Sequence, residues 1–335
     1  MTPLLDVRDL RVSFPEPGGA RITPVDGVTF TLERGRTLAL VGESGCGKSL
    51  TSLAILRLVP PPGRIDDGSH LRLGETDLLA LEGESLRRVR GRRIAMIFQD
   101  PMTSLNPVFT VESQITEVVH AHFKSSKRDA RDRAAALLQE VGIPDPLARL
   151  KAYPHQLSGG MRQRVMIAIA LAGQPEILIA DEPTTALDVT VQAQILEVLD
   201  GLRESHGMAV LLITHDLGIV AGRADRVAVM YAGQIVESAP TAALFANPSH
   251  PYTRGLFASV PRLTGPAGRL SPIPGNVPPP SAWPSGCRFR TRCPIVHPRS
   301  ADMPPLLPVG PDHLIRCWLA EDGAPEGRAP GVAAR

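Results

Sequence analysis

Cysteine is scarce in this sequence, which contains only 4 in 335 residues. So few cysteines do not form the disulfide framework of a small secreted protein. Net charge is also small, because 36 Lys and Arg are set against 34 Asp and Glu, a difference of +2. A balance so close to zero does not favour a general binder of nucleic acids or of membrane surfaces.

Long apolar runs are missing as well. The longest uninterrupted run is Val165–Ala172, far short of the roughly 18–20 residues that a membrane-spanning helix needs. The first ten residues, Met1 to Leu10, have no basic segment followed by an apolar stretch, so we expect no signal peptide. With 43% apolar and 21% charged residues, the composition is that of an ordinary globular protein.

Proline is plentiful but unevenly distributed. Of the 33 prolines, 19 lie at or after Pro240. The length is enough for about two domains at roughly 150 residues each. The sequence therefore predicts a compact domain followed by a Pro-rich, loop-like C-terminal segment.

Apolar patterns in the first 240 residues predict alternating strands and helices. A helix is expected at Lys48–Leu58, another at Val189–His206, and mostly helical structure over residues 100–172, including a helix that Ser125 or Ser126 would cap. The expected strands are Leu4–Phe14, Val25–Leu32, Thr37–Val41, Arg93–Phe98, Glu176–Ala180 and Met208–Thr214. This alternation favours an α/β protein with a parallel core, present once because no internal repeat is visible.

A phosphate-binding motif lies between the third strand and the first helix. Residues 42–49 read GESGCGKS and fit the pattern G-x-x-x-x-G-K-[ST] of a P-loop. Its glycines let backbone N–H groups turn inward around a phosphate, at the N-terminus of a helix. We expect the nucleotide to contact Gly42, Glu43, Ser44, Gly45, Cys46, Gly47, Lys48, Ser49 and Leu50. Cys46 is interpreted as a small filler and not as a reactive thiol.

Two acidic residues complete the predicted site. Asp181 and Glu182 follow the apolar strand that ends at Ala180. We expect Lys48 to reach the β- and γ-phosphates, and Ser49 to ligate Mg²⁺ together with Asp181, which would act directly or through water. Glu182 would polarise the attacking water as a general base. The predicted chemistry is the removal of a γ-phosphate by water.

The remaining motifs carry a family resemblance. Residues 157–164 read LSGGMRQR, and together with the P-loop they strongly resemble the signature of the ATP-binding-cassette (ABC) ATPases. Gln99 is similar to the family's Q-loop glutamine, and His215 to its switch histidine. The segments similar to the Walker B end and to the D-loop are Asp181-Glu182-Pro183 and Ala186-Leu187-Asp188. The resemblance covers about residues 4–250.

The resemblance implies the fold and its division. It implies an α/β P-loop NTPase cassette over residues 1–250, with a RecA-like parallel sheet core and an N-terminal antiparallel β subdomain. A helical signature subdomain is expected at about residues 100–172. A Pro-rich C-terminal tail, typical of peptide-permease ATPases, would occupy residues 251–335.

Roles for further residues follow from the resemblance. Gln99 and His215 would sense the γ-phosphate, and Gln99 would also face Mg²⁺, although either side chain could instead be an ordinary surface residue. Phe14 would stack on adenine, the alternative being a core residue. The family pairs two cassettes head to tail, so part of the site comes from a second chain. This chain would contribute Ser158, Gly159, Gly160 and Asp188 to its partner's nucleotide.

The sequence around the motifs resembles that of one group of ABC importers. Residues 99–107, 153–156 and 247–253 are similar to the peptide/nickel group, and residues 161–168 to the D-type ATPase of dipeptide and oligopeptide permeases. The resemblance implies an ATPase that energises peptide uptake from the cytoplasmic face of the cell (inner) membrane, with nickel or glutathione as alternative cargoes. Implied partners are an F-type ATPase, two membrane-spanning permease subunits that segment 100–125 faces, and an extracytoplasmic substrate-binding protein, with no nucleic acid.

Other classes of function are weighed against this one. A soluble ABC ATPase that acts on DNA or ribosomes typically carries a long insertion or two cassettes. Only 57 residues separate Gln99 from Leu157, and one cassette is present. A regulatory module whose tail senses metal or redox state would need a complete set of ligands in that tail.

The tail holds a cysteine cluster. Members of the D type carry four cysteines here, and in some of them the cluster binds a 4Fe–4S centre. This chain has Cys287, Cys293 and Cys317, but Ser300 stands where the third cysteine would be expected. Three interpretations stay open: no metal, an iron–sulfur cluster with a substituted ligand set, or zinc with His297 or His313 as added ligands.

Overall fold

The computed structural model describes residues 3–100, 104–185, 187–259 and 273–321. Pro101 to Thr103 of the Q-loop segment and Ala186 of the D-loop lie outside the described residues, as do two parts of the predicted tail. None of the helices in the described ranges combines the length and the apolar character that crossing a membrane requires.

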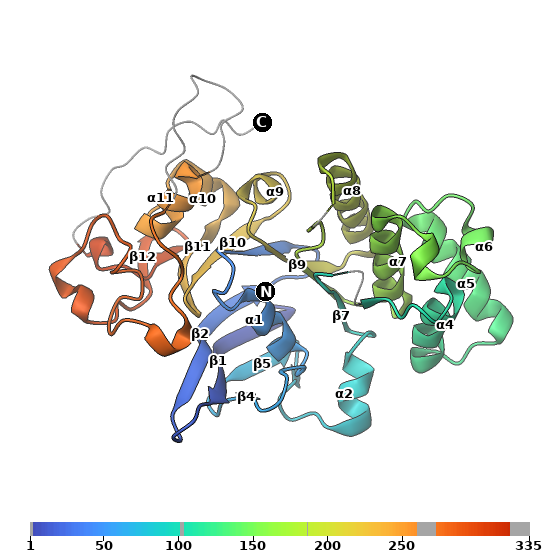
Figure 1. The fold of residues 1–335 in the computed structure, drawn as a ribbon, viewed down its shortest axis with the longest axis horizontal. Helices are drawn as coiled ribbons and strands as arrows, with labels where there is room; N and C mark the ends of the chain where they lie inside the picture. The colour runs from blue at the N-terminus through green and yellow to red at the C-terminus, as the bar shows by residue number, and fades with distance from the viewer. Residues whose placement is uncertain (1–2, 101–103, 186, 260–272, 322–335) are drawn as a thin grey trace.

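A large mixed sheet forms the centre of the molecule (Figure 1). Its strand order is β12-β13-β11-β10-β3-β9-β8-β7, and the five strands from β10 to β7 run parallel. The strands are β3 (Thr37–Val41), β7 (Ile94–Ile97), β8 (Ile177–Asp181), β9 (Ala209–Thr214), β10 (Arg226–Tyr231), β11 (Gln234–Pro240), β12 (Leu307–Gly310) and β13 (His313–Ile315). The predicted parallel α/β core is confirmed.

Both faces of the parallel sheet are covered, as β3 illustrates. Leu38 and Leu40 pack into the core shared with helix α1 (Lys48–Ile55) and the N-terminal strands. Ala39 and Val41, which point the other way, pack against helices α9 and α10. All five β3 residues are therefore buried, as expected for a central parallel strand. The helices above the sheet in Figure 1 are α8 (Val189–His206), α9 (Leu217–Ala221), α10 (Thr241–Ala246) and α11 (Pro251–Ala258).

A smaller antiparallel sheet lies below the large one in Figure 1. Its order is β2-β1-β5-β6, with β4 also paired to β1. Leu5 and Val7 of β1 are fully buried, whereas Asp6 and Arg8, which alternate with them, are not, as expected for a half-buried strand. The elements of this part are β1 (Leu5–Pro15), β2 (Arg21–Leu32), β4 (Arg64–Ile65), β5 (His70–Leu73), β6 (Thr76–Asp77), α1 (Lys48–Ile55) and α2 (Gly83–Val89).

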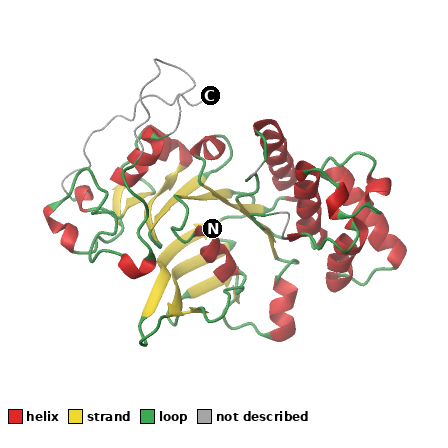
Figure 2. Cartoon of the chain, in the orientation of Figure 1, coloured by secondary structure: helices red, strands yellow, loops and turns green. Residues whose placement is uncertain are grey.

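A helical lobe, residues 104–172, projects from the right side in Figure 2. It contains α4 (Val111–His122), α5 (Lys127–Glu140), α6 (Pro146–Arg149), η1 (Pro154–Gln156) and α7 (Gly159–Ala172). Of the two predicted caps, Ser126 is the one that begins α5, since its hydroxyl accepts from the amide of Asp129 at 3.2 Å. Val165, Ile167 and Ala168 of α7 are fully buried, which places α7 at the centre of the lobe.

The C-terminal extension, residues 251–321, is attached to the main sheet. Strand β13 pairs with β11, so the sheet continues across the predicted boundary at residue 250. The carboxylate of Glu237, which is fully buried in β11, accepts from the amides of Ser249 and His250 at 2.7 and 2.9 Å and meets Nε2 of His313 at 2.7 Å. Three short helices, η2 (Pro280–Ala282), η3 (Pro298–Ala301) and η4 (Trp318–Ala320), complete the extension.

Candidate functional site

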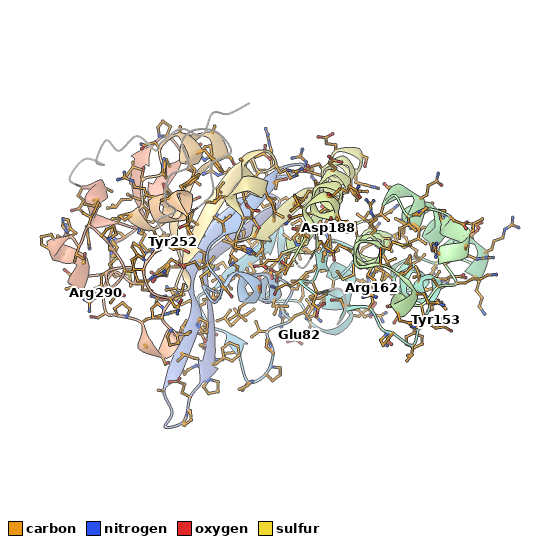
Figure 3. The ribbon with its side chains drawn as sticks, turned by 45° about the horizontal axis from the view of Figure 1, so that its top comes forward. Glu82, Tyr153, Arg162, Asp188, Tyr252 and Arg290 are labelled. Carbon is orange, nitrogen blue, oxygen red and sulfur yellow. The ribbon has the colours of Figure 1, made fainter. Side chains whose placement is uncertain are left out.

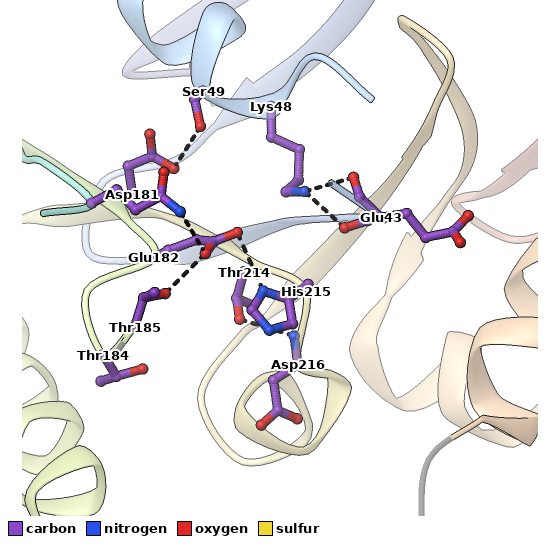
Figure 4. A network of polar contacts seen from close by, with 12 residues as sticks. Glu43, Lys48, Ser49, Asp181, Glu182, Thr184, Thr185, Thr214, His215 and Asp216 are labelled. Atoms are coloured by element: carbon purple, nitrogen blue, oxygen red, sulfur yellow. Dashed lines mark hydrogen bonds and ion pairs between the residues drawn. The ribbon is translucent and has the colours of Figure 1, made fainter. Parts of the chain in front are cut away.

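The candidate site lies where three adjacent parallel strands end. Residues 42–49 follow β3, Glu182 follows β8 and His215 follows β9. Because β8, β9 and β3 are neighbours in register, their carboxyl ends share one edge of the sheet, where open α/β sheets bind ligands. Figure 4 shows the side chains that converge there.

Two glycines shape the phosphate loop. A Cβ atom on Gly42 would lie 2.2 Å from the carbonyl oxygen of Met230, so no larger residue fits there. Gly47 has φ +105° and begins α1 without any side-chain cap. The first amides of α1 are therefore left without a capping side chain, which makes this helix end a suitable anion site.

The ammonium of Lys48 is held inside the loop. Its Nζ atom donates to the carbonyl oxygens of Gly42 at 2.7 Å and Glu43 at 3.0 Å, and the side chain is buried. Burial raises the pKa of the enclosed Cys46 thiol, in agreement with its interpretation as a filler. Ser44 and Gly45 at the loop tip are exposed. The loop thus holds a buried positive charge beside the open end of α1.

Ser49 and Asp181 form a pair of oxygen donors. The Ser49 hydroxyl donates to Oδ1 of Asp181 at 3.1 Å. Burial raises the pKa of Asp181, while the bond from Ser49 opposes that effect. A hydroxyl and a carboxylate are ligands that Mg²⁺ prefers, and the charge of the ion would offset the cost of a buried carboxylate. The residues present therefore fit the predicted Mg²⁺ site.

Glu182 is held by three neighbours (Figure 4). Its Oε2 atom accepts from Gln99 Nε2 at 3.0 Å and from the Thr185 hydroxyl at 2.9 Å, and its Oε1 atom lies 3.2 Å from His215 Nδ1. Burial, the largest single influence, raises the pKa of Glu182, but the bonds from Thr185 and His215 and the nearby charges outweigh it and lower the pKa. The carboxylate is kept ionised, as a general base requires.

The signature residues lie at the start of α7, in the helical lobe. The Ser158 hydroxyl caps α7 by accepting from the amide of Met161 at 3.3 Å. A Cβ atom on Gly160 would come within 2.7 Å of Val191, at the start of α8. Asp188 caps α8 by accepting from the amide of Val191 at 3.0 Å. Figure 3 labels Asp188, at the start of α8, and Arg162 in α7.

Comparisons with known proteins decide the family. A family model described as "ABC transporter" matches residues 25–185, and one described as "Oligopeptide/dipeptide transporter, C-terminal region" matches residues 236–299. Two relatives from Bacillus subtilis (strain 168) are similar over nearly the whole chain. The oligopeptide transport ATP-binding protein OppD is 50% identical over 98% of this chain and 92% of its own, and the dipeptide transport ATP-binding protein DppD is 49% identical over 99% of both.

The chain belongs to the ABC transporter family. Within it, the resemblance to the ATP-binding proteins of oligopeptide and dipeptide importers is confirmed. A post-hydrolysis dimer of the ATP-binding cassette MJ0796, bound to ADP and Pi, matches the structure with a TM-score of 0.63. That match has 26% identity and covers 71% of this chain and 98% of the other. The predicted P-loop ABC fold is therefore confirmed.

Within one cassette, the predicted residues fall into two groups. The P-loop, Asp181, Glu182, Gln99 and His215 meet at one sheet edge, whereas Figure 1 shows α7 in the helical lobe, away from α1. Phe14 lies near the end of β1 and is half-buried. A Cβ atom on Gly63 would lie 2.5 Å from its ring, so the ring packs within its own subdomain. Adenine stacking by Phe14 stays a prediction.

Three residues of this ABC ATPase site were missed by sequence reasoning. Thr185 donates to Glu182, and a hydroxyl three residues after the acid is the only signal that could have indicated it. Tyr252 and Arg292 contact Glu43 of the phosphate loop. Both lie more than 200 positions along the chain from Glu43, so no local pattern could have revealed them.

The three tail cysteines of the ABC protein gather around one small cavity, which Ser300 and His297 also line. Burial raises the pKa of all three thiols, that of Cys317 to about 11. In the described ranges, no three His, Cys, Asp or Glu side chains are grouped to hold a metal ion. Because Ser300 replaces a cysteine, the residues present do not fit a four-cysteine iron–sulfur cluster, and a cluster with a substituted ligand set stays a prediction.

The zinc alternative loses one of its ligands in the structure. His313 is absent from the lining of the cysteine cavity. Its Nε2 atom meets Glu237 in β11, where both side chains are buried. His313 therefore links β13 to β11.

Proposed function

We propose that this chain is the MgATP-hydrolysing subunit of an importer for dipeptides and oligopeptides. The observation that carries the proposal is the joint arrangement of Lys48, the Ser49–Asp181 pair and Glu182 at one sheet edge. The extension that matches the oligopeptide/dipeptide family supports the choice of cargo, as do the relatives named for peptide transport.

The residues suggest the chemical steps. Lys48 and the amides at the start of α1 bind the β- and γ-phosphates. Ser49 and Asp181 would hold Mg²⁺, which would neutralise phosphate charge. Glu182 takes a proton from the attacking water as that oxygen bonds to the γ-phosphorus. The bond to the bridging oxygen breaks, and ADP leaves with those electrons. Gln99 and His215, now bonded to Glu182, are positioned to respond to the γ-phosphate.

The other proposed parts of the assembly follow from the two separate groups of residues. Ser158, Gly159, Gly160 and Asp188 would complete the nucleotide site of a second cassette, which we propose is an F-type subunit. The dimeric, nucleotide-bound state of the similar cassette MJ0796 supports this arrangement. Two permease subunits and an extracytoplasmic binding protein would complete the importer, with this chain on the cytoplasmic face of the membrane.

The test is transport by the reconstituted importer. Proteoliposomes that contain this chain and its membrane partners are given labelled peptides of two to five residues, Ni²⁺ or glutathione, with MgATP on the cytoplasmic side. We expect ATP-dependent uptake of peptide. The matched control is Glu182→Gln, which keeps the size of the side chain. It should bind ATP normally but lower hydrolysis and uptake by roughly a thousandfold, within the usual contribution of a general base.

Two results would contradict the proposal. Uptake of Ni²⁺ or glutathione without peptide uptake would show that the ATPase energises the import of one of these alternative cargoes. Near-normal hydrolysis by the Glu182→Gln importer would remove Glu182 from the role of base.

A further inference from the structure

The C-terminal extension contacts the phosphate loop at Glu43. Arg292 donates from Nη1 to Oε2 of Glu43 at 2.7 Å and from Nη2 to Oε1 at 3.0 Å. The Arg292 side chain is only 5% exposed. A two-point pair of this kind, shielded from water, is more directional and less screened than an ordinary surface ion pair.

Arg292 is itself fixed by the extension. It donates to the carbonyl oxygens of Pro274 at 2.8 Å and Gly275 at 2.9 Å, and it lies 5.7 Å from the centre of the Tyr231 ring. Burial acts to lower the pKa of Arg292, but the bonds to Glu43 and the nearby Tyr231 outweigh it and raise the pKa. The guanidinium therefore joins the extension to the loop in one orientation.

A second contact reaches the same loop residue. The amide of Glu43 donates to the hydroxyl of Tyr252 at 2.9 Å, and Tyr252 is fully buried. The Tyr252 ring packs on Tyr231, with centroids 4.7 Å apart. The amide of Glu43, expected from the sequence to face the nucleotide, thus faces the extension.

The backbone carbonyl of Glu43 contacts the phosphate-binding lysine. Its carbonyl oxygen accepts from Nζ of Lys48 at 3.0 Å. Glu43 is therefore bound to the extension through its amide and carboxylate, and to the phosphate-binding lysine through its carbonyl. Tyr252 and Arg292 of the extension therefore contact the residue that binds the Lys48 ammonium. Figure 4 shows the contact between Lys48 and Glu43.

We propose that Arg292 is a positioning residue for the phosphate site, one that holds Glu43 so that the loop and Lys48 keep the geometry that MgATP requires. This inference rests on the proposed function, since it takes MgATP to be the ligand of the loop. Arg292 acts through Glu43 and touches no reacting atom. The C-terminal extension thereby becomes part of the nucleotide site.

Arg316 provides a matched control in the same extension. Its guanidinium is partly buried and donates to the carbonyl oxygens of Ile235 at 3.1 Å and Pro304 at 3.2 Å. It anchors the extension to β11, and none of its hydrogen bonds goes to the phosphate loop. Loss of Arg316 should weaken the attachment of the extension without releasing Glu43.

The experiment measures MgATP binding by the purified full-length chain with a fluorescent ATP analogue, alongside thermal unfolding without nucleotide. We expect Arg292→Leu to raise Kd about tenfold, which corresponds to about 1.4 kcal/mol. Arg292→Lys should rescue binding only in part, because an ammonium cannot reproduce the two-point bond. Arg316→Leu should bind MgATP within about twofold of the parent at a similar loss of thermal stability.

A double variant tests the route through Glu43. Glu43→Gln should weaken binding by itself, and Arg292→Leu combined with it should add little, because both changes break one contact. Fully additive effects would overturn the inference, as would equal weakening by Arg292→Leu and Arg316→Leu. If the parent and Arg292→Leu bind MgATP equally well, the inference is overturned but the proposed function is not. A parent that binds no MgATP overturns the proposed function, and the inference with it.

Discussion

Helices α1 and α7 both begin at a site predicted to face a phosphate, yet their surroundings differ. The start of α1 has no side-chain cap and lies beside Lys48 and the Ser49–Asp181 pair. The start of α7 is capped by its own Ser158, and the side chains close to its glycines are apolar, Leu187 and Val191. The start of α1 therefore has the charged groups that bind phosphate and metal, whereas the start of α7 contributes amides, a hydroxyl and a helix dipole.

The difference explains how two cassettes would share one task. Helix α1 has what is needed to bind a nucleotide within one chain. Helix α7 has no acidic residue in its first turn, and Nε of Arg162 there donates to the carbonyl oxygen of Pro154. We therefore expect α7 to add hydrogen bonds to a nucleotide that is already bound. We therefore expect the α1 end to determine affinity in the isolated chain, and the α7 end to matter for hydrolysis by the assembled transporter.

Ser158→Arg should separate the roles of the two helix ends most strongly. A long cation at the first position of the signature would block approach of a second cassette. The isolated chain should bind MgATP within about twofold of the parent, whereas hydrolysis by the assembled transporter should fall at least about a hundredfold, as when an oxyanion donor is lost. Phosphate release and nucleotide titration measure the two effects. Loss of MgATP binding in the isolated chain would show that the two helix ends are not independent.

The pH dependence of hydrolysis tests the role of Glu182 beside the α1 end. Because its hydrogen bonds lower the pKa of Glu182, the carboxylate stays ionised to lower pH, and activity is lost only as pH falls through that lowered pKa. Thr185→Val removes one of the bonds, so the pKa of Glu182 should rise and the acid limb of kcat against pH should move to higher pH. Thr185→Ser keeps the hydroxyl and should leave that limb in place. An unchanged acid limb in Thr185→Val would contradict the assignment of Glu182 as the base.

The sequence predicted the α1 end better than it predicted the extension, for physical reasons. Strand Thr37–Val41 and helix Val189–His206 have the predicted ends, because a Gly-rich turn follows the strand and Asp188 and Gly207 bound the helix. Strands β12 and β13 have only four and three residues in a Pro-rich segment. They pair with each other, and β13 joins the main sheet through the distant strand β11.

The contacts between side chains show the same limit. The motifs indicated that Gln99, Glu182 and His215 lie at one phosphate site, but they gave no sign that Gln99 and His215 both bond to Glu182. The bond from Arg292 to Glu43 spans 249 positions and involves a charge type that is common throughout the sequence. Local spacing identifies residues that share a ligand, whereas pairing across the fold depends on tertiary packing.

Two serine caps in the helical lobe allow a closely matched test in which the expected effects are the smallest. Ser126 and Ser158 begin α5 and α7 in the same way, each accepting from an amide three residues on, at 3.2 and 3.3 Å. Ser126→Ala should lower the free energy of unfolding by about 1 kcal/mol, the usual value of such a cap, and leave hydrolysis unchanged. Ser158→Ala should lose similar stability and, in the assembled transporter, also lower hydrolysis about tenfold, as expected for one lost hydrogen bond worth about 1.4 kcal/mol. Chemical denaturation and phosphate release measure the two quantities, and equal hydrolysis by both variants would reduce Ser158 to an ordinary helix cap.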